Sequence, residues 1–329
     1  MAIIAGNTAY ALESVATGSN IREDLGNVIY NVTPYKTPFS SGVAKTRATN
    51  DNHEWLTDTL ADTAPSFKIE ANDIAASTTD ARVRKGNFVG ILQETATVSK
   101  KAEMFDRAGI PGKEMAYQLL KKGKELQMTM EKSLLLAGGG VVKVAPTNSA
   151  AGVPAPVSSW IESNQSAATN GTPNGASTGA TNTVLGDNRT FEEAFLTSVL
   201  DGVWNGSGDF SNVSIMADAA RVTSIRSKVN GMAGAEGMTT DVSAGEIYNR
   251  IAIYQSQFGP VKVIPNKHMP TNQIYVLDMS SWGIAFGGGK TIHTTELSTS
   301  TSAEKQLLET YFTLEARSEE ANGAVYSIS

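Results

Sequence analysis

The stretch Gly109–Ala137 constrains the fold of this chain more than any other part of the sequence. Turn signals bracket it, because Pro111 stands near its start, where a missing N–H leaves no helical hydrogen bond unmade, and three glycines follow at 138–140. Its apolar side chains recur within about 100° of arc, the stripe of a half-buried helix. They are Met115, Leu119, Leu126, Met130 and Leu134. The sequence therefore predicts one long helix over about 110–137, flanked by extended segments.

The composition excludes several classes of protein. The 329 residues are 40% hydrophobic but contain no run of about 18 apolar residues, so we expect no membrane span. No cysteine is present, which excludes disulfides, thiolate nucleophiles and cysteine-ligated zinc together. The first residues lack a basic region, so no signal peptide is expected. A net charge of −6 argues against a dedicated nucleic-acid-binding surface.

Residues 1–55 contain few periodic segments and are predicted to form an extended arm. A short helix fits residues 13–24. Residues 32–39 are not expected to form one, because Pro34 and Pro38 interrupt it. Apolar residues such as Tyr35 and Phe39 are too frequent for a solvated tail. We therefore favour an arm that packs on a partner over a disordered one.

Residues 53–103 have a strand-like pattern, which a polar centre at 72–80 divides into two extended runs. This pattern predicts a long, protruding hairpin. Because an isolated two-stranded hairpin is only marginally stable in water, it needs support from another chain or from a packed base. Arg82, Arg84 and Lys85 form a basic patch on it. The patch is either a charged edge that prevents aggregation or a contact with acidic residues of a neighbouring subunit.

Residues 144–188 form the loosest region, in which Trp160–Glu162 is the anchored spot and 165–183 is expected to be a mobile loop. A compact α/β unit follows, with a first helix predicted over 190–200 and capped by Thr190 or Asp187. The other elements predicted for this part are a helix over 217–229, strands over 213–216, 247–254, 261–264 and 274–277, and a final strand pair, 307–316 with 324–328, across a turn at Asn322–Gly323.

No motif predicts catalysis, a cofactor or a metal site. Gly287–Thr291 resembles the end of a phosphate-binding loop, but the Walker spacing requires glycine where the chain has Ile284. The segment 274–278 resembles a Walker B strand, yet no sequence remains between the two for the helix and crossover of such a site. The three histidines lack zinc-ligand spacing, and no G-x-S-x-G elbow occurs. We therefore expect no enzymatic activity.

The order of parts and several phrases resemble the SU10-like major head protein family of tailed phages, whose fold is HK97-like. The phrases are Asn31–Phe39, Ala151–Gly152 followed by Trp160–Ile161, Phe258–Pro270, Tyr275–Asp278, and Thr313–Glu315 with Asn322–Gly323. The resemblance implies an α+β fold. It also implies a major capsid protein that self-assembles into the icosahedral shell enclosing phage double-stranded DNA.

The resemblance further implies a division of the chain into named parts. They are an N-terminal arm (1–55), an E-loop hairpin over a neighbouring subunit (56–103), a P-domain with the spine helix and a flexible loop (104–188), an A-domain around the axes of hexamers and pentamers (189–290), and return strands of the P-domain (291–329). No Lys, Asn and acid could be matched to the cross-linking chemistry of some relatives.

The partners implied are other copies of the chain as hexamers and pentamers, portal and scaffolding proteins, and packaged DNA by non-specific proximity, with no membrane. A decoration or cement protein is left open. The implied location is the virion, with the host cytoplasm during assembly. We place the contacts between subunits, as a hypothesis, at Tyr35, Phe39, Trp55, Phe67, Arg82, Arg84 and Lys85.

Three alternatives remain at this point. An encapsulin-like nanocompartment shell would share the fold and enclose cargo enzymes in place of DNA. A phage tail structural protein would share the loop-rich composition but would not need the long helix. A nucleoside triphosphatase is the enzymatic alternative, and absence of nucleotide binding would remove it.

Overall fold

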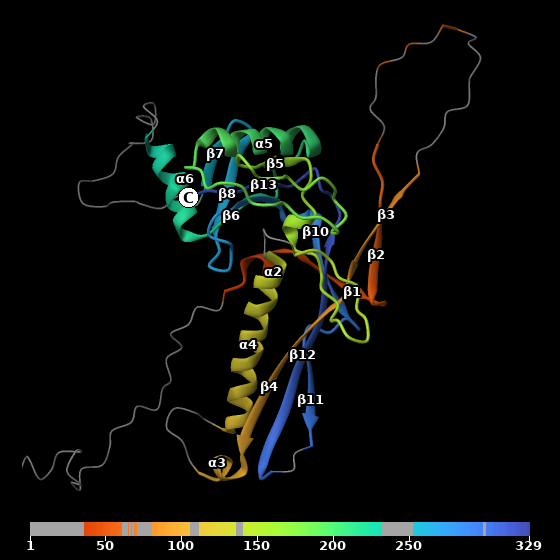
Figure 1. Cartoon of the computed structure of the whole chain (residues 1–329), viewed down its shortest axis with the longest axis vertical. Coiled ribbons are helices and arrows are strands. Elements are labelled where there is room, and N and C mark those ends of the chain that lie inside the picture. Colours follow the sequence, from red (N-terminus) through yellow and green to blue (C-terminus); the bar gives the residue numbers. More distant parts are fainter. Residues whose placement is uncertain are drawn as a thin grey trace, which may run out of the picture.

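The computed structural model describes residues 36–60, 65, 67, 69–70, 81–105, 112–135, 141–231, 253–298 and 301–329 (Figure 1). The helix expected over 13–24 lies outside these residues, as do Tyr35 and the glycines at 138–140. The described elements, in chain order, are α2 (Pro38–Gly42), β1 (Ala44–Ala48), β2 (Asn52–Thr57), β3 (Val83–Phe88), β4 (Gly90–Ser99), α3 (Lys100–Met104), α4 (Glu114–Leu135), η2 (Val157–Ser159), β5 (Asn164–Ser166), α5 (Glu193–Ser207), β6 (Val213–Ala217), α6 (Ala219–Gly231), β7 (Ile253–Ser256), β8 (Gly259–Pro265), β9 (Ile274–Asp278), η4 (Met279–Ser281), β10 (Trp282–Gly287), β11 (His293–Leu297), β12 (Ala303–Ala316) and β13 (Gly323–Val325).

The first sheet is organised around the 14-residue strand β12. The antiparallel partner β4 runs along residues 303–312 of β12, and β11 pairs with residues 305–309. Beyond them, β10 pairs with residues 312–316, and β1 adds a parallel strand outside β10. The sheet around this long strand therefore joins an early part of the chain, residues 44–99, to a late part, residues 282–316 (Figure 1).

The long helix predicted from the sequence is α4, which packs on β4 and β12. Its apolar stripe is confirmed, because Met115, Leu126, Met130 and Leu134 are buried and Leu119 packs against the cluster around Met115. No helix in the described part of the chain is both long and apolar enough to cross a membrane. The helix forms one layer of the body and the sheet forms the other (Figure 1).

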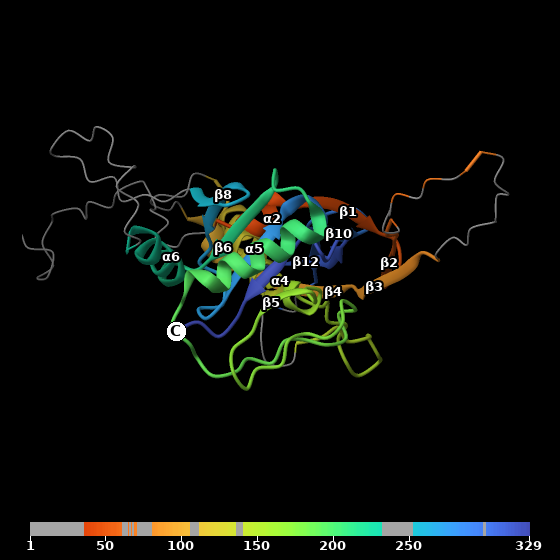
Figure 2. The same ribbon diagram turned by 90° about the horizontal axis from the view of Figure 1, so that it is seen from above.

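A second sheet of six strands has the order β5-β13-β9-β6-β8-β7. Every residue of β6 is buried, and so are the first four of β9, which is typical of central strands covered on both faces. Helix α5 lies across this sheet, and α6 stands beside it (Figure 2). The strands predicted over 213–216, 261–264 and 274–277 are confirmed, while the part of the 247–254 strand before Ile253 lies outside the described residues.

The predicted pairing of the last two strands is wrong. β12 lies in the first sheet, whereas β13 lies in the second, between β5 and β9. Alternating apolar residues predict that a strand is half-buried but do not name its partner. The end of β12 has no edge left for β13, because β10 occupies one edge and side chains of the hairpin bond the carbonyls of the other.

The first helix of the α/β unit begins later than predicted, at Glu193, and ends at Ser207. Neither Thr190 nor Asp187 caps it, because the N-cap residue is Glu192, and its side chain makes no capping hydrogen bond. The backbone of Arg189 is already paired with the end of the chain, since its N–H donates to Ser327 O at 2.8 Å and its carbonyl accepts from Ser329 N. This extended pairing delays the start of the helix.

The segment 165–183, expected from its composition to be a mobile loop, is held by hydrogen bonds around Asn174. This side chain is 2% exposed, and its amide nitrogen donates to the carbonyls of Ser159 and Ile161 at 3.1 and 2.9 Å. Its backbone N–H donates to the side chains of Gln165 and Thr183. Composition indicated a lack of regular structure correctly, but small polar residues also build buried hydrogen-bond networks.

A buried carboxylate joins the start of the described chain to α4. Glu131 has no exposed surface, and its two oxygens accept hydrogen bonds from the backbone N–H groups of Phe39 and Ser40, each at 2.8 Å. The amide of Asn266 donates to it as well, at 2.8 Å. Helix α4, helix α2 and the turn after β8 therefore meet at one side chain.

We predict that Glu131→Ala lowers the free energy of unfolding by about 3 kcal/mol, because three buried donors lose their acceptor at once. Urea unfolding followed by tryptophan fluorescence measures the change. Lys132→Ala, at the exposed neighbouring position, is the matched control and should change stability by less than about 0.5 kcal/mol. Equal stability of the two variants would contradict this role of Glu131.

Candidate functional site at the base of the hairpin

The hairpin predicted from the sequence is present as the antiparallel pair β2–β3, which stands away from the body (Figure 1). Its register pairs Trp55 with Lys85 and Leu56 with Arg84. Because directly opposed residues point to the same side of a sheet, Trp55 and Lys85 share one face and Leu56 and Arg84 share the other. The face that carries Trp55 is turned toward the body, as the contacts below show.

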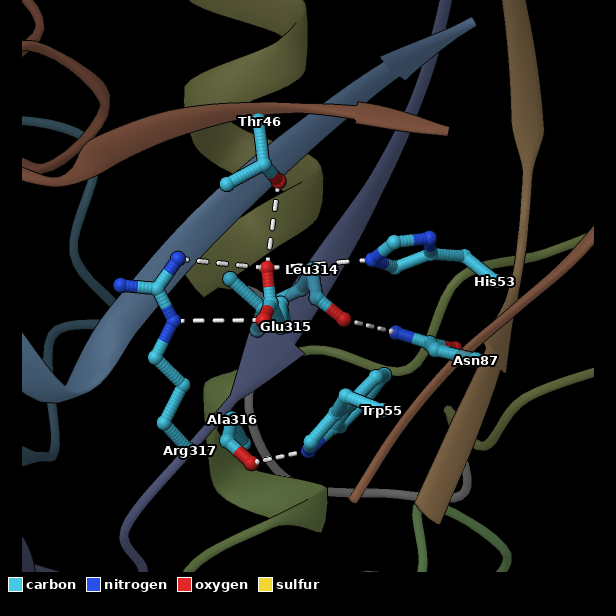
Figure 3. Close-up of polar contacts among 8 residues, drawn as sticks. All are labelled: Thr46, His53, Trp55, Asn87, Leu314, Glu315, Ala316 and Arg317. Carbon is cyan, nitrogen blue, oxygen red and sulfur yellow. Dashed lines mark hydrogen bonds and ion pairs between the residues drawn. The ribbon is translucent and has the colours of Figure 1, made fainter. Parts of the chain in front are cut away.

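Two side chains of the hairpin bond consecutive outward carbonyls of β12 (Figure 3). The indole Nε1 of Trp55 donates to Ala316 O at 2.7 Å, and Nδ2 of the fully buried Asn87 donates to Leu314 O at 2.9 Å. The Trp55 ring also packs on Trp160, with 5.3 Å between centroids. These contacts supply the packed base that a two-stranded hairpin requires.

Between these two carbonyls lies the side chain of Glu315, at the centre of a polar cluster (Figure 3). Its Oε2 accepts from the hydroxyl of Thr46 on β1 at 3.1 Å, and its Oε1 accepts from Nε of Arg317 at 3.2 Å. His53 Nε2 lies 3.8 Å from Oε2, which makes an ion pair when the imidazole is protonated. We call His53, Trp55, Asn87, Leu314, Glu315 and Ala316 the hairpin-base cluster.

The surroundings of Glu315 favour its charged form. The neighbouring His53 imidazole has the largest influence and lowers the pKa of this carboxyl, against burial, which acts to raise it. The Arg317 guanidinium and the Thr46 hydroxyl lower it further, and the resulting pKa is about 2. A charged carboxylate therefore joins β1 to the end of β12 through its hydrogen bonds with Thr46 and Arg317, and His53 of β2 lies beside it.

The hairpin face that carries Leu56 and Arg84 is exposed, and so is the far end of the hairpin. Arg84 pairs with Glu54 at 3.4 Å and keeps 71% of its side chain exposed, and Arg82 pairs with Asp58 at 3.4 Å with 69% exposed. Exposed ion pairs of this kind contribute little to stability. Large apolar side chains accompany them, and five are more than half exposed: Leu56, Leu60, Phe67, Ile69 and Val83.

The structure divides the seven residues that the sequence placed between subunits. Tyr35 lies outside the described residues. The Phe39 ring is fully buried against Trp282 of its own chain, and Trp55 and Lys85 face the body, where Lys85 Nζ lies 3.1 Å from Ser177 Oγ. The three that present their side chains to solvent are Phe67, Arg82 and Arg84.

Sequence reasoning did not single out the polar members of the cluster. His53 was noted only as an isolated histidine, Glu315 appeared only within a phrase of the family resemblance, and Asn87 carried no signal. Asn87 is separated from Leu314 by 227 positions, and Thr46 from Glu315 by 269. No local spacing connects such residues. The pairing of β1 with β10 and of β10 with β12 brings Thr46 to Glu315, and the packing of the hairpin on β12 brings Asn87 to Leu314.

The segments that resembled nucleotide-binding motifs have structural roles. Gly288 and Gly289 adopt positive φ angles of 65° and 79° in a Gly-rich turn between β10 and β11. The Asp278 side chain caps η4 by accepting from Ser280 N at 2.9 Å. Among the described residues, no group of three His, Asp or Glu side chains is placed to hold a metal ion.

A sequence profile of the family described as the SU10 major capsid protein matches residues 5–329. The chain belongs to the SU10 major capsid protein family. The function as a phage major capsid protein, expected from the sequence, is thereby confirmed. The major capsid protein of Escherichia phage Phieco32 is 34% identical to this chain over 110 residues. These residues cover 33% of this chain and 31% of that protein.

Solved structures confirm the HK97-like capsid fold of this SU10 family member. The capsid of a native GTA particle superposes with a TM-score of 0.64 at 12% identity, covering 96% of this chain and 98% of the other. The capsid of Cyanophage A-1(L) gives 0.58 at 13% identity, covering 97% and 99%. The SrpI encapsulin complex of Synechococcus elongatus PCC 7942 gives 0.55 at 9% identity, covering 100% and 97%. The encapsulin alternative therefore shares the fold, and the family match favours the capsid.

We predict that acid weakens the hairpin-base cluster through Glu315. Because its pKa of about 2 in the folded chain lies below the ordinary value of 4.5, the charged carboxylate stabilises the fold above about pH 4.5. That contribution is lost progressively as the pH falls from about 4.5 through about 2. Urea midpoints of the unaltered chain and of Glu315→Gln, measured at neutral pH and near pH 3, should converge in acid. A constant difference between the two proteins would contradict the prediction.

Proposed function

We propose that this chain self-assembles into a closed icosahedral phage shell, in which the β2–β3 hairpin is an E-loop that lies over a neighbouring subunit. The observation that carries the proposal is the two-sidedness of the hairpin. Its inner face is bonded to β12 through Trp55 and Asn87, while its outer face exposes Arg84 and Leu56 without cover from the described part of the chain. A hairpin that served only its own subunit would not need an exposed apolar far side.

The proposed division of the chain follows the resemblance with changed boundaries: β4 moves from the hairpin to the P-domain, β5 and β13 move to the A-domain, and the arm becomes shorter. Helix α2 and β1 belong to the body, because Phe39 is buried in its core and β1 pairs with β10. We therefore end the arm before Lys36 rather than at residue 55. Helix α4 with β4, β11 and β12 forms the P-domain, and the second sheet with α5 and α6 forms the A-domain.

The finer assignments are also proposals. They comprise hexamers and pentamers as building units, contacts with portal and scaffolding proteins, packaged double-stranded DNA held by non-specific proximity, assembly in the host cytoplasm, and a structural rather than enzymatic role. The related GTA and cyanophage structures are capsids, which supports a location in the virion. A decoration protein remains open.

Expression of the chain alone and together with its candidate scaffolding gene tests the proposal. Negative-stain electron microscopy should show closed shells, or rings of five and six subunits, in at least one of the two preparations. A folded monomer in both preparations would overturn self-assembly. Undetectable nucleotide binding would independently remove the triphosphatase alternative.

We predict that replacing Arg82 and Arg84 together by Gln lowers the yield of assembled particles severalfold while the unfolding midpoint of the subunit stays unchanged. A small loss of binding free energy at one contact is repeated at every copy in a shell. An exposed ion pair, in contrast, contributes little to the stability of one subunit. Particle yield by size-exclusion chromatography and urea unfolding of the subunit measure the two effects.

Lys85→Gln is the matched control on the same hairpin, because Lys85 faces its own body and contacts Ser177. It should reduce subunit stability slightly and leave assembly close to that of the unaltered chain. A loss of particles as large as that of the double variant would show that the two faces of the hairpin have been assigned the wrong way round.

A further inference from the structure

A small cavity lies where the edge of β12 passes from β10 to β11. β10 pairs with residues 312–316 of β12 and β11 pairs with residues 305–309, so Thr310 lies between the two partners. The cavity has a volume of about 120 Å³, roughly ten times what one water molecule requires. Its walls come from α2, β1, α4 and the turn after β10, and we call it the Thr310 cavity.

Thr310 contributes a buried hydroxyl to this cavity. It lies on the same side of β12 as Leu308, which is next to Gly123 of α4, so its side chain points toward the helix. The residue is 2% exposed, and its Oγ1 has no hydrogen-bond partner within the described part of the chain. Because a buried hydroxyl without a partner is costly, this atom indicates a polar group that binds in the cavity.

The remaining walls are partly apolar and partly polar. The hydroxyls of α2 are engaged with their own turn, since Ser40 Oγ donates to the Thr37 carbonyl and Ser41 Oγ lies 3.4 Å from Thr37 Oγ1. They therefore make less demand on a ligand than Thr310 does. Four apolar side chains complete the lining: Leu126, Met130, Phe286 and Ile292.

Positive charge gathers beside the cavity. Thr46 of β1 bonds Glu315 on one side of the strand. Its neighbours Lys45 and Arg47 therefore point to the other side, where Lys45 lines the cavity. Arg47 lies against the turn after β10, which also carries the exposed Lys290. Among the residues that the structure describes, none of these three cations forms an ion pair.

The lining excludes two classes of ligand. It contains no carboxylate, and Glu131, which lies behind Ser40, already accepts hydrogen bonds from three donors. A metal ion or an ammonium group would therefore find no acidic partner in the cavity. A purely apolar ligand would leave the Thr310 hydroxyl unpaired. An anionic group joined to a short apolar stem satisfies both parts of the lining.

We infer that the Thr310 cavity binds a carboxylate carried on a short aliphatic stem. The carboxylate accepts a hydrogen bond from Thr310 Oγ1 and pairs with the Lys45 ammonium, because both groups line one small cavity. The stem packs on Met130 and Phe286. A free short-chain acid and a glutamate side chain of a polypeptide present this same chemistry. The inference does not depend on the proposed function, because one subunit supplies every wall named here.

Thermal unfolding of the unassembled full chain tests the site, because a ligand that binds only the folded state raises the unfolding midpoint. The probe is sodium butyrate, titrated to about 100 mM against sodium chloride at equal ionic strength. The midpoint should rise with butyrate more than with chloride or with butyramide, which keeps the stem but lacks the charge. A butyrate response no larger than the chloride response would overturn the inference.

Thr310→Val removes the hydroxyl and keeps the shape of the side chain. The variant should be at least as stable as the unaltered chain, since it loses an unpaired buried group, yet bind butyrate about tenfold more weakly. Thr313→Val is the matched control, because Thr313 has a fully buried hydroxyl without a described partner on the opposite face of β12. Its butyrate response should be unchanged. Equal butyrate affinities of the two variants would overturn the role of Thr310.

Lys45→Gln should weaken butyrate binding severalfold through loss of the charge pair. Lys85→Gln changes the net charge equally on the hairpin, where Lys85 contacts Ser177, and should leave binding unchanged. Equal weakening in these two variants would show that butyrate responds to the net charge of the chain, and would overturn the inference. Inorganic phosphate that binds more tightly than butyrate would overturn the role of the stem.

A blocked tripeptide, acetyl-Ala-Glu-Ala-amide, separates the two sources of the carboxylate. Competition with butyrate would support the site as one for a glutamate side chain, whereas butyrate binding without competition would support it as one for a free acid. None of these measurements requires assembly. A chain that never forms shells would therefore overturn the proposed function and leave the test of the Thr310 cavity intact.

Discussion

The pairing of β12 is the interaction on which the rest of the subunit depends. Ten of its residues pair with β4 along one edge, while β11 and β10 share the other. Past the end of β4, the carbonyls of Leu314 and Ala316 would be left without partners at a buried edge, which is costly for backbone groups. Asn87 and Trp55 of the hairpin donate to these two carbonyls. The carbonyls at the end of β12 therefore set the direction of the hairpin.

This dependence explains how one chain combines a stable body with a reaching element. The polar groups of the hairpin-base cluster contact other groups of the same subunit, and the charged Glu315 side chain lies between β1, β2 and β12. The outer face of the hairpin keeps only exposed ion pairs and apolar side chains. In the proposed shell, this division would let subunit stability and contact between subunits be adjusted by different residues. Weak contacts repeated by symmetry then supply the stability of a shell.

Several elements were predictable because their signals are local. The stripe of Met115, Leu126 and Leu134 has the period of a helix, and the burial of these residues follows the predicted face. The short apolar runs that became β6, β8 and β9 were recognised as strands for the same reason. Of the basic patch predicted from the sequence, Arg82 and Arg84 are exposed, whereas Lys85 contacts Ser177 of its own body. The resemblance to a capsid family rested on short phrases spread over the whole chain, and the family profile covers nearly all of it.

Other features depended on which distant segments share a sheet. The sequence by itself determined the long helix, the hairpin, the buried strands and the capsid family, because periodicity and short phrases are properties of neighbouring residues. Only the tertiary structure decided that β12 and β13 lie in different sheets. It also decided that Phe39, Trp55 and Lys85 pack against the body of their own subunit. It alone also brought Thr46, His53 and Glu315 into one cluster. Strand partners are chosen by competition for free edges across the whole chain, and no local pattern records the result of that competition.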